Sequence, residues 1–110
     1  MNEIKNTLLK KIQSKNAVIG ILGMGYVGLP LMLRYIDVGF QVIGFDIDQK
    51  KIDTIQAGQS YIEHISATVI QNANNEGMDV TTNFSRINHT DAIILYPVST
   101  SWTDSASLLR

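Results

Sequence analysis

Three glycines at positions 23, 25 and 28 form the pattern with the clearest chemical meaning in this sequence. They directly follow a short apolar run, residues 17–22, and precede a stretch with helical periodicity. In a strand–turn–helix context, Gly23 allows a tight turn, Gly25 lets the backbone approach a ligand, and Gly28 lets the helix pack close to the strand. The free amide groups and the dipole at the helix start attract an anion. The spacing therefore predicts a site for the pyrophosphate of a dinucleotide, and a turn that binds nothing is the competing interpretation.

An aspartate at position 46 supplies the second feature expected of such a site. It ends another apolar run, residues 41–45, and lies 18 residues after Gly28, close to the spacing of about 20 at which a ribose-binding acid occurs. A carboxylate there accepts hydrogen bonds from a 2′-hydroxyl and repels a 2′-phosphate, so the sequence favours NAD over NADP. Lys50 and Lys51 weaken this preference slightly, because a nearby cation tolerates phosphate.

Other polar side chains give weaker signals. The adjacent Glu63 and His64 could act as an acid and a base, but nothing nearby completes a catalytic set, so an exposed surface pair is the simpler interpretation. His89 beside Asp91 is weaker still. The absence of cysteine excludes disulfides, thiolate zinc sites and cysteine nucleophiles. We therefore assign neither a catalytic residue nor a metal ligand to this chain.

Strand and helix patterns alternate along the chain, which indicates an α/β fold with a parallel sheet. The sequence predicts a basic amphipathic helix over residues 1–16, with an apolar stripe of Ile4, Leu8, Leu9 and Ile12 that docks on a neighbouring element. The predicted strands cover residues 17–22, 41–45, 78–82 and 91–95. The predicted helices cover residues 27–38, 48–57 and 61–75, with Asp48 as a cap and with Ile62, Ile65, Val69 and Ile70 facing inward. The expected strand order is 3-2-1-4, as in half of a Rossmann-type domain.

Composition limits the classes of protein to which the chain can belong. Its 110 residues suit one domain at most, and an apolar content of 45% is enough for a core. No apolar stretch is long enough to cross a membrane, and the N-terminus lacks the apolar run of a signal peptide. The basic residues are scattered and the net charge is −1, which argues against nucleic acid as a partner. We expect a cytoplasmic protein without membrane or nucleic-acid partners.

Beyond the glycine pattern itself, the sequence GMGYVGLPL at residues 23–31 closely resembles the nucleotide-sugar 6-dehydrogenases, the UDP-glucose/GDP-mannose dehydrogenase family. The resemblance covers roughly residues 16–95 and includes GFDID at 44–48, KIDTIQAGQSYIEHI at 51–65, and TTNFSRI and DAIIL within 81–95. The Leu-Pro-Leu at 29–31 is similar to the UDP-N-acetylhexosamine branch. Within that branch, the sequence is most similar to the bacterial members that oxidise UDP-N-acetylglucosamine in O-antigen biosynthesis.

The resemblance implies an oxidoreductase that converts the sugar C6 hydroxyl to a carboxylate in two NAD-dependent hydride transfers, through a thioester on a catalytic cysteine. Carried over to this chain, it implies that the pyrophosphate is lined by Gly23, Gly25, Tyr26, Val27 and Gly28. Asp46 would then hold the adenosine ribose, and Lys51 would lie beside it. Family members continue into a central helix and a nucleotide-sugar domain that carry the catalytic residues. We therefore expect this chain to be inactive alone, and the full-length enzyme to bind a UDP-sugar and form a homo-oligomer.

The resemblance stops at Tyr96, where the family normally reads Cys-Val-Pro-Thr-Pro and this chain reads YPVSTSW over residues 96–102. The expected organisation is therefore an N-terminal helix (1–16), a truncated NAD-binding Rossmann domain (17–95) and an off-pattern tail (96–110). The abrupt change is typical of a shifted reading frame. Translation of the DNA from the codon of Leu95 in the other two frames should restore Val-Pro-Thr-Pro, and its absence from both would exclude a shift.

Two other interpretations remain open. The chain could be a stand-alone nucleotide-binding or interaction module without catalysis. It could also be a fragment of another NAD enzyme that acts on alcohols, such as a hydroxyacid dehydrogenase. The sequences GYVGLPL and QSYIEHI disfavour this last interpretation, because other dehydrogenases do not share them as a set.

Overall fold

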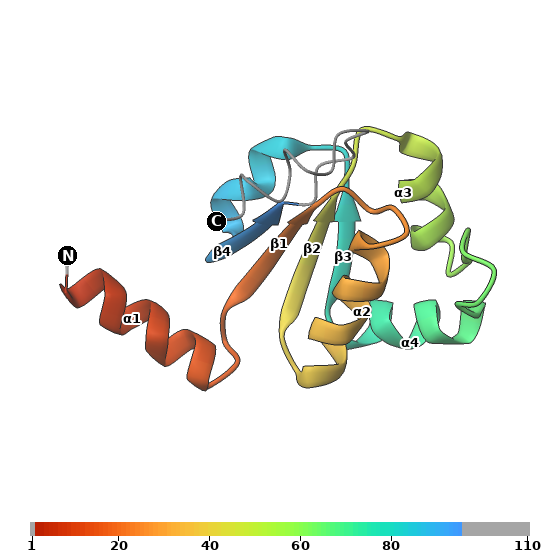
Figure 1. The fold of residues 1–110 in the computed structure, drawn as a ribbon. Coiled ribbons are helices and arrows are strands. Elements are labelled where there is room, and N and C mark those ends of the chain that lie inside the picture. The colour runs from red at the N-terminus through yellow and green to blue at the C-terminus, as the bar shows by residue number, and fades with distance from the viewer. Residues whose placement is uncertain (1, 96–110) are drawn as a thin grey trace, which may run out of the picture.

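A four-stranded parallel sheet organises the chain in the computed structural model, which describes residues 2–95, with only the backbone described for residues 2–4 (Figure 1). The helices are α1 (Asn2–Gln13), α2 (Gly28–Val38), α3 (Gln49–Gln56), α4 (Ala67–Glu76) and the 3-10 helix η1 (Phe84–His89). The strands are β1 (Val18–Leu22), β2 (Gln41–Phe45), β3 (Met78–Thr81) and β4 (Ala92–Leu95). Their spatial order is β3-β2-β1-β4, which confirms the predicted α/β class and strand order.

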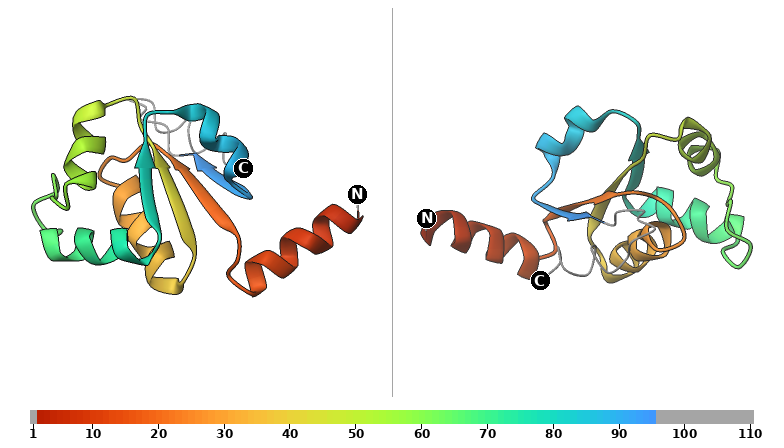
Figure 2. Two further views of the ribbon diagram at one scale, coloured as in Figure 1. Left: turned by 180° about the vertical axis from the view of Figure 1, so that it is seen from behind. Right: turned by 45° about the horizontal axis from the view of Figure 1, so that its top comes forward.

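The two faces of the sheet are covered differently. The α2 and α4 helices cover one face, and α3 closes the same core beside β3, whereas η1 packs on the opposite face (Figures 1 and 2). On that opposite face, the ring of Phe84 in η1 stacks on Phe45 at the end of β2, with 5.7 Å between the ring centroids. The side of the sheet that carries α2 therefore holds most of the apolar core.

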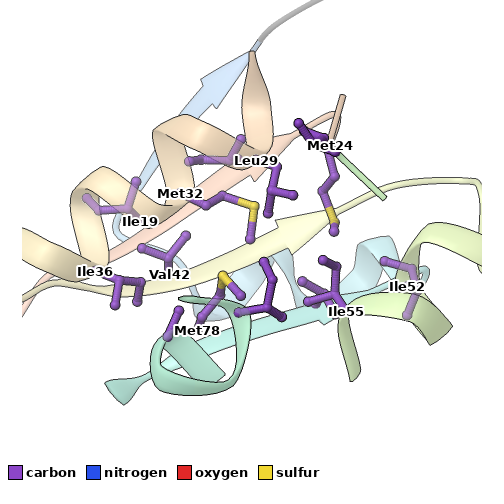
Figure 3. Packing of buried hydrophobic residues seen from close by; sticks show 14 of the residues in the cluster. Ile19, Met24, Leu29, Met32, Ile36, Val42, Ile52, Ile55 and Met78 are labelled. Atoms are coloured by element: carbon purple, nitrogen blue, oxygen red, sulfur yellow. The ribbon is translucent and has the colours of Figure 1, made fainter. Parts of the chain in front are cut away.

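The core joins the glycine turn to the strands around it. Figure 3 shows Met32 of α2 in one cluster of buried side chains that includes Ile19 and Val42 of the strands and Ile55 of α3. Full burial of side chains of this size stabilises the fold by roughly 1.5–3 kcal/mol each. Gly44 in β2 makes room for this packing, because a Cβ there would lie 2.5 Å from the Met32 Cε atom. These contacts fix α2 against β1 and β2 and so define the position of the turn between β1 and α2.

The helix predicted over residues 61–75 begins later than expected. Ser66 occupies the N-cap position, where its hydroxyl accepts a hydrogen bond from the Val69 amide at 3.3 Å, and α4 starts at the next residue. Ile62 and Ile70 are buried as predicted, but Val69 is 44% exposed, so its inward orientation was wrong. The apolar spacing from residue 61 mimics a helix, whereas the serine cap fixes the real start. The 3-10 helix η1 was not predicted.

The N-terminal helix is present but does not dock as expected. It covers residues 2–13 of the predicted 1–16 and projects from the edge of the sheet (Figure 1). Leu9 and Ile12 on its apolar stripe are exposed, so for them the predicted docking was wrong.

An ion pair between the Lys11 Nζ atom and Asp91 at 2.9 Å joins this N-terminal helix to the rest of the domain. The Lys11 ammonium, and then the Val18 amide, hold the pKa of Asp91 below its usual range. Among the described helices, none has the length and apolar character needed to cross a membrane.

We predict that the exposed apolar side chains of β4 make the chain self-associate. Within the described residues, β4 forms one edge of the sheet, and its Ile93 and Leu95 side chains are 45% and 52% exposed. Unpaired, apolar edge strands promote association. Sedimentation should show a mass that rises with concentration, and the double substitution Ile93→Thr and Leu95→Thr should shift the equilibrium towards monomer. Val69→Thr is the matched control, because it removes a similarly exposed apolar side chain from α4. A sharp, concentration-independent melt of a dilute monomer would contradict the prediction.

Candidate dinucleotide-binding site

Two of the three glycines in the turn are required by the fold itself. Gly23 has a φ of 96°, in the left-handed region that glycine adopts at little cost, and its amide donates to the Phe45 carbonyl at 2.8 Å. Gly28 begins α2 so close to the end of β1 that an added Cβ would lie 1.8 Å from the Gly23 carbonyl oxygen. The strand and the helix can therefore meet at this distance only with glycine at position 28.

Gly25 differs from these two glycines because no contact or backbone angle in the described chain requires a glycine at this position. Its φ is not positive, and a Cβ built on it would have no non-neighbouring heavy atom within 4 Å. An alanine would therefore fit the described structure. The space above this residue is open, so a ligand can reach its backbone without meeting a side chain. This geometry fits a ligand that approaches the main chain closely, as a pyrophosphate does at such turns.

The start of α2 lacks the cap that the later helices have. Val27 occupies the N-cap position without a side-chain hydrogen bond, and the amides of Gly25, Tyr26 and Val27 donate to no acceptor among the described residues. The helical segments α3, α4 and η1 are capped by the side chains of Asp48, Ser66 and Asn83, respectively. Tyr26 and Val27 are exposed, so their amide groups lie in an accessible segment. Uncapped amides at the positive end of a helix are suited to an anion.

The structure brings Asp46 and the glycine turn together. The aspartate follows β2, and its Oδ2 atom accepts a hydrogen bond from the Met24 amide at 2.9 Å. Its Oδ1 atom accepts from the Asp48 amide, also at 2.9 Å. An ionised carboxylate has about four acceptor positions, so about two remain for other donors. Asp48 itself caps α3 by accepting from the Lys50 amide, as predicted.

Lys51 lies near Asp48 but does not pair with Asp46. In the described part of the chain, its ammonium forms no ion pair; its Nζ atom lies 5.9 Å from the centre of the Tyr61 ring. Both side chains line a shallow cavity of about 250 Å³ beside α3, together with Asp48, Lys50 and Thr54. The Glu63 and His64 side chains are exposed, and residues 2–95 include no cluster of three or more side chains that could hold a metal ion.

Three residues at this site were not singled out from the sequence. Met24 is fully buried, its amide donates to Asp46, and its carbonyl accepts a hydrogen bond from the Tyr61 hydroxyl. Ile47 is 87% exposed directly after Asp46, which is unusual for an isoleucine. Met24 occupies a variable position of the glycine motif, and Tyr61 is 37 residues away in the sequence. Only the tertiary contacts reveal their connection.

The fold agrees with the comparison to known families. The sequence model of the NAD binding domain of the UDP-glucose/GDP-mannose dehydrogenase family matches residues 17–107, so the chain belongs to this family. The match extends past Leu95 into the tail that the sequence pattern set apart. The chain is thus an NAD-binding domain of a nucleotide-sugar dehydrogenase family, and NAD is its cofactor.

Individual relatives match this chain over part of their length. UDP-N-acetyl-D-mannosamine dehydrogenase of Escherichia coli K12 is 41% identical over 58 residues, which are 52% of this chain and 14% of the relative. The solved structure of a ternary complex of GDP-mannose dehydrogenase from Pseudomonas aeruginosa is also similar, with 30% sequence identity and a TM-score of 0.69. The similarity covers 76% of this chain and 20% of the chain in that structure. The structure of the UDP-N-acetyl-mannosamine dehydrogenase of Staphylococcus aureus is similar over 73% of this chain and 19% of its own chain, with 30% identity and a TM-score of 0.64. The chain therefore spans about a fifth or less of these relatives.

The contrast between two glycines gives a direct test of the site's construction. Gly28→Ala should lower the free energy of unfolding by more than about 3 kcal/mol, because the new methyl group collides with a backbone carbonyl. Gly25→Ala should change it by less than about 1 kcal/mol, because the methyl group meets open space. Urea denaturation of both variants measures the difference. Equal destabilisation by the two substitutions would show that Gly25 has a structural role after all.

Proposed function

We propose that this chain binds NAD with its pyrophosphate at the turn of Gly23, Gly25, Tyr26, Val27 and Gly28. The observation that carries the proposal is the uncapped start of α2 beside the open backbone at Gly25. The amides of this turn provide donors for the phosphate oxygens, and the helix dipole favours their negative charge. The bound pyrophosphate would thus supply the N-terminal cap that the helix lacks.

The adenosine half of NAD is proposed to lie next to the end of β2. The remaining acceptor positions of the Asp46 carboxylate would receive the ribose hydroxyls. Ile47 would cover an apolar face of the adenine, which explains why so large an apolar side chain is exposed at this point. Lys51 is close enough to Asp48 to share a cavity with it and is proposed to lie beside the ribose.

For the whole protein we propose oxidation of a UDP-N-acetylhexosamine at C6 to the carboxylate, with two NAD per sugar, in bacterial surface-polysaccharide biosynthesis such as that of O-antigen. The Leu-Pro-Leu after the glycine turn supports this substrate class, as do relatives named UDP-N-acetyl-D-mannosamine dehydrogenase. The sequence resemblance favours UDP-N-acetylglucosamine as the substrate, whereas the names of these relatives favour its C2 epimer, UDP-N-acetylmannosamine. A cytoplasmic homo-oligomer is proposed for the complete enzyme, and the present chain is proposed to be inactive alone.

We predict that the chain binds NAD at least about tenfold more tightly than NADP, because the Asp46 carboxylate repels a 2′-phosphate. Isothermal titration with both cofactors measures the two affinities. Asp46→Asn should reduce the NAD-to-NADP ratio by about fivefold, since it removes the charge and keeps the size of the side chain. The ratio is the useful quantity because Asp46 also accepts a hydrogen bond from the Met24 amide in the turn. The substitution should therefore weaken the binding of both cofactors by loosening the turn.

Asp53→Asn is the matched control, because it removes an exposed carboxylate of α3 that bonds Gln49 rather than the turn. This variant should leave the ratio unchanged. A ratio that is the same in the Asp46→Asn variant and the unaltered chain would remove the ribose assignment. A chain that binds neither cofactor would favour an interaction module instead.

Enzyme assays test the proposal for the whole protein. A full-length protein that contains this domain should form two NADH per molecule of UDP-N-acetylglucosamine or its C2 epimer, and the preferred epimer identifies the substrate. The 110-residue chain should form none. Activity towards UDP-glucose or GDP-mannose alone would contradict the proposed substrate class.

A further inference from the structure

The main chain of Met24, between the first two glycines of the turn, is held from two sides. Its amide donates to the Asp46 Oδ2 atom at 2.9 Å, and its carbonyl accepts from the Tyr61 hydroxyl. Its side chain is fully buried, with the sulfur 3.0 Å from the position that a Cβ on Gly44 would take. Both polar groups and the side chain of this residue are therefore fixed by tertiary contacts.

The Tyr61 hydroxyl reaches the turn from a well-anchored segment between α3 and α4. The next residue, Ile62, is 2% exposed and belongs to the core. The Ser60 hydroxyl donates to the Ile62 carbonyl at 3.0 Å and accepts from the Ile62 amide at 3.1 Å. The tyrosine thus approaches Met24 from a segment whose own conformation is fixed by burial and hydrogen bonds.

The Tyr61 hydroxyl is in the protonated form, which can donate a hydrogen bond. Burial, followed by the nearby carboxylates of Asp46 and Asp48, raises the pKa of Tyr61 above its usual value. An ordinary tyrosine already keeps its proton at neutral pH, and the raised pKa of Tyr61 keeps its hydroxyl a donor at still higher pH. The Lys51 ammonium lies over the ring of the same tyrosine, so the ring and the hydroxyl have separate partners.

We propose that Tyr61 is a positioning residue for the pyrophosphate turn: with Asp46, it fixes the Met24 peptide, so that the following amides of Gly25 and Tyr26 keep one orientation towards an anion. The inference rests on the proposed NAD-binding function. Glycines on both sides of Met24 give this segment unusual conformational freedom. Ordering such a segment during binding reduces affinity, whereas a turn that is already ordered avoids that loss. The two side chains supply the order that the glycines do not.

Tyr61→Phe tests the proposal, because it removes the hydroxyl but keeps the ring beneath Lys51. Tyr35→Phe is the matched control: its ring packs edge-on against Phe40, and its hydroxyl bonds to no side chain or carbonyl of the described part. NAD, ADP and adenosine are titrated into the chain and followed through its backbone amide NMR signals. In Tyr61→Phe, the affinities for NAD and ADP should fall by about three- to tenfold, which corresponds to the net contribution of one hydrogen bond. Adenosine binding should stay the same, and the control should match the unaltered chain with all three ligands.

The outcomes separate the inference from the proposed function. If the unaltered chain binds NAD and Tyr61→Phe binds NAD and ADP equally well, the positioning role is wrong and the proposed function stands. An equal loss for adenosine would indicate a general loosening of the site and would also overturn the inference. If the unaltered chain does not bind NAD, the proposed function fails and the inference fails with it.

A measurement without ligand provides a second, independent test. In the ligand-free chain, Tyr61→Phe should shift or broaden the amide signals of Gly25 and Tyr26, while signals from the sheet, such as that of Val42, remain in place. The Tyr35→Phe control should leave the turn signals unchanged. Unchanged Gly25 and Tyr26 signals in a folded Tyr61→Phe chain would show that the tyrosine does not order the turn.

Discussion

The close approach of α2 to the end of β1 is the constraint on which the other features of this domain depend. At Gly28 the helix comes so near to the Gly23 carbonyl that no side chain fits between them. This contact places the first turn of the helix directly above the carboxyl end of the central strand. It also places the buried side chains of α2, such as Met32, against β2. The position of the uncapped helix start is thus a consequence of backbone packing in the core.

The backbone of this turn is flexible by sequence, because it contains glycines, but hydrogen bonds from residues outside the turn restrict its conformation. Glycine at positions 23 and 25 leaves the local backbone without the steric limits that other residues impose. Contacts from outside the turn then restrict it, because Asp46 binds the Met24 amide and Tyr61 binds its carbonyl. A rigid arrangement of donors is favourable for binding an anion, since little conformational entropy is lost when the ligand arrives. Stability and the proposed ligand recognition therefore depend on neighbouring residues within one short segment.

Family membership and site geometry explain different properties of the chain. Membership in the UDP-glucose/GDP-mannose dehydrogenase family identifies NAD as the cofactor. The geometry is the basis for the proposal that the amides after Gly23 and the carboxylate of Asp46 hold this cofactor. The chain spans about a fifth or less of the relatives described above, so the sugar and its oxidation concern the whole protein. Gly25 provides the clearest link between the two kinds of information, because the space above its backbone is open in the described structure and the proposed pyrophosphate site uses that space.

Sequence alone predicted the strands, the glycine turn and the place of Asp46, because these depend on local patterns: apolar runs, glycine spacing and the ends of predicted strands. The strand order followed from the Rossmann-type arrangement that these patterns indicate. It did not determine where α4 begins, because the apolar spacing from residue 61 fits a helix until the Ser66 cap is known. Tertiary structure decided that Leu9 and Ile12 of α1 remain exposed and that Tyr61 contacts Met24. Such contacts join residues distant in the chain, and no periodicity within one segment encodes them. The sequence thus specified the strands, most of the helices and the order of the strands in the sheet, whereas packing between these elements decided which side chains bond to the turn.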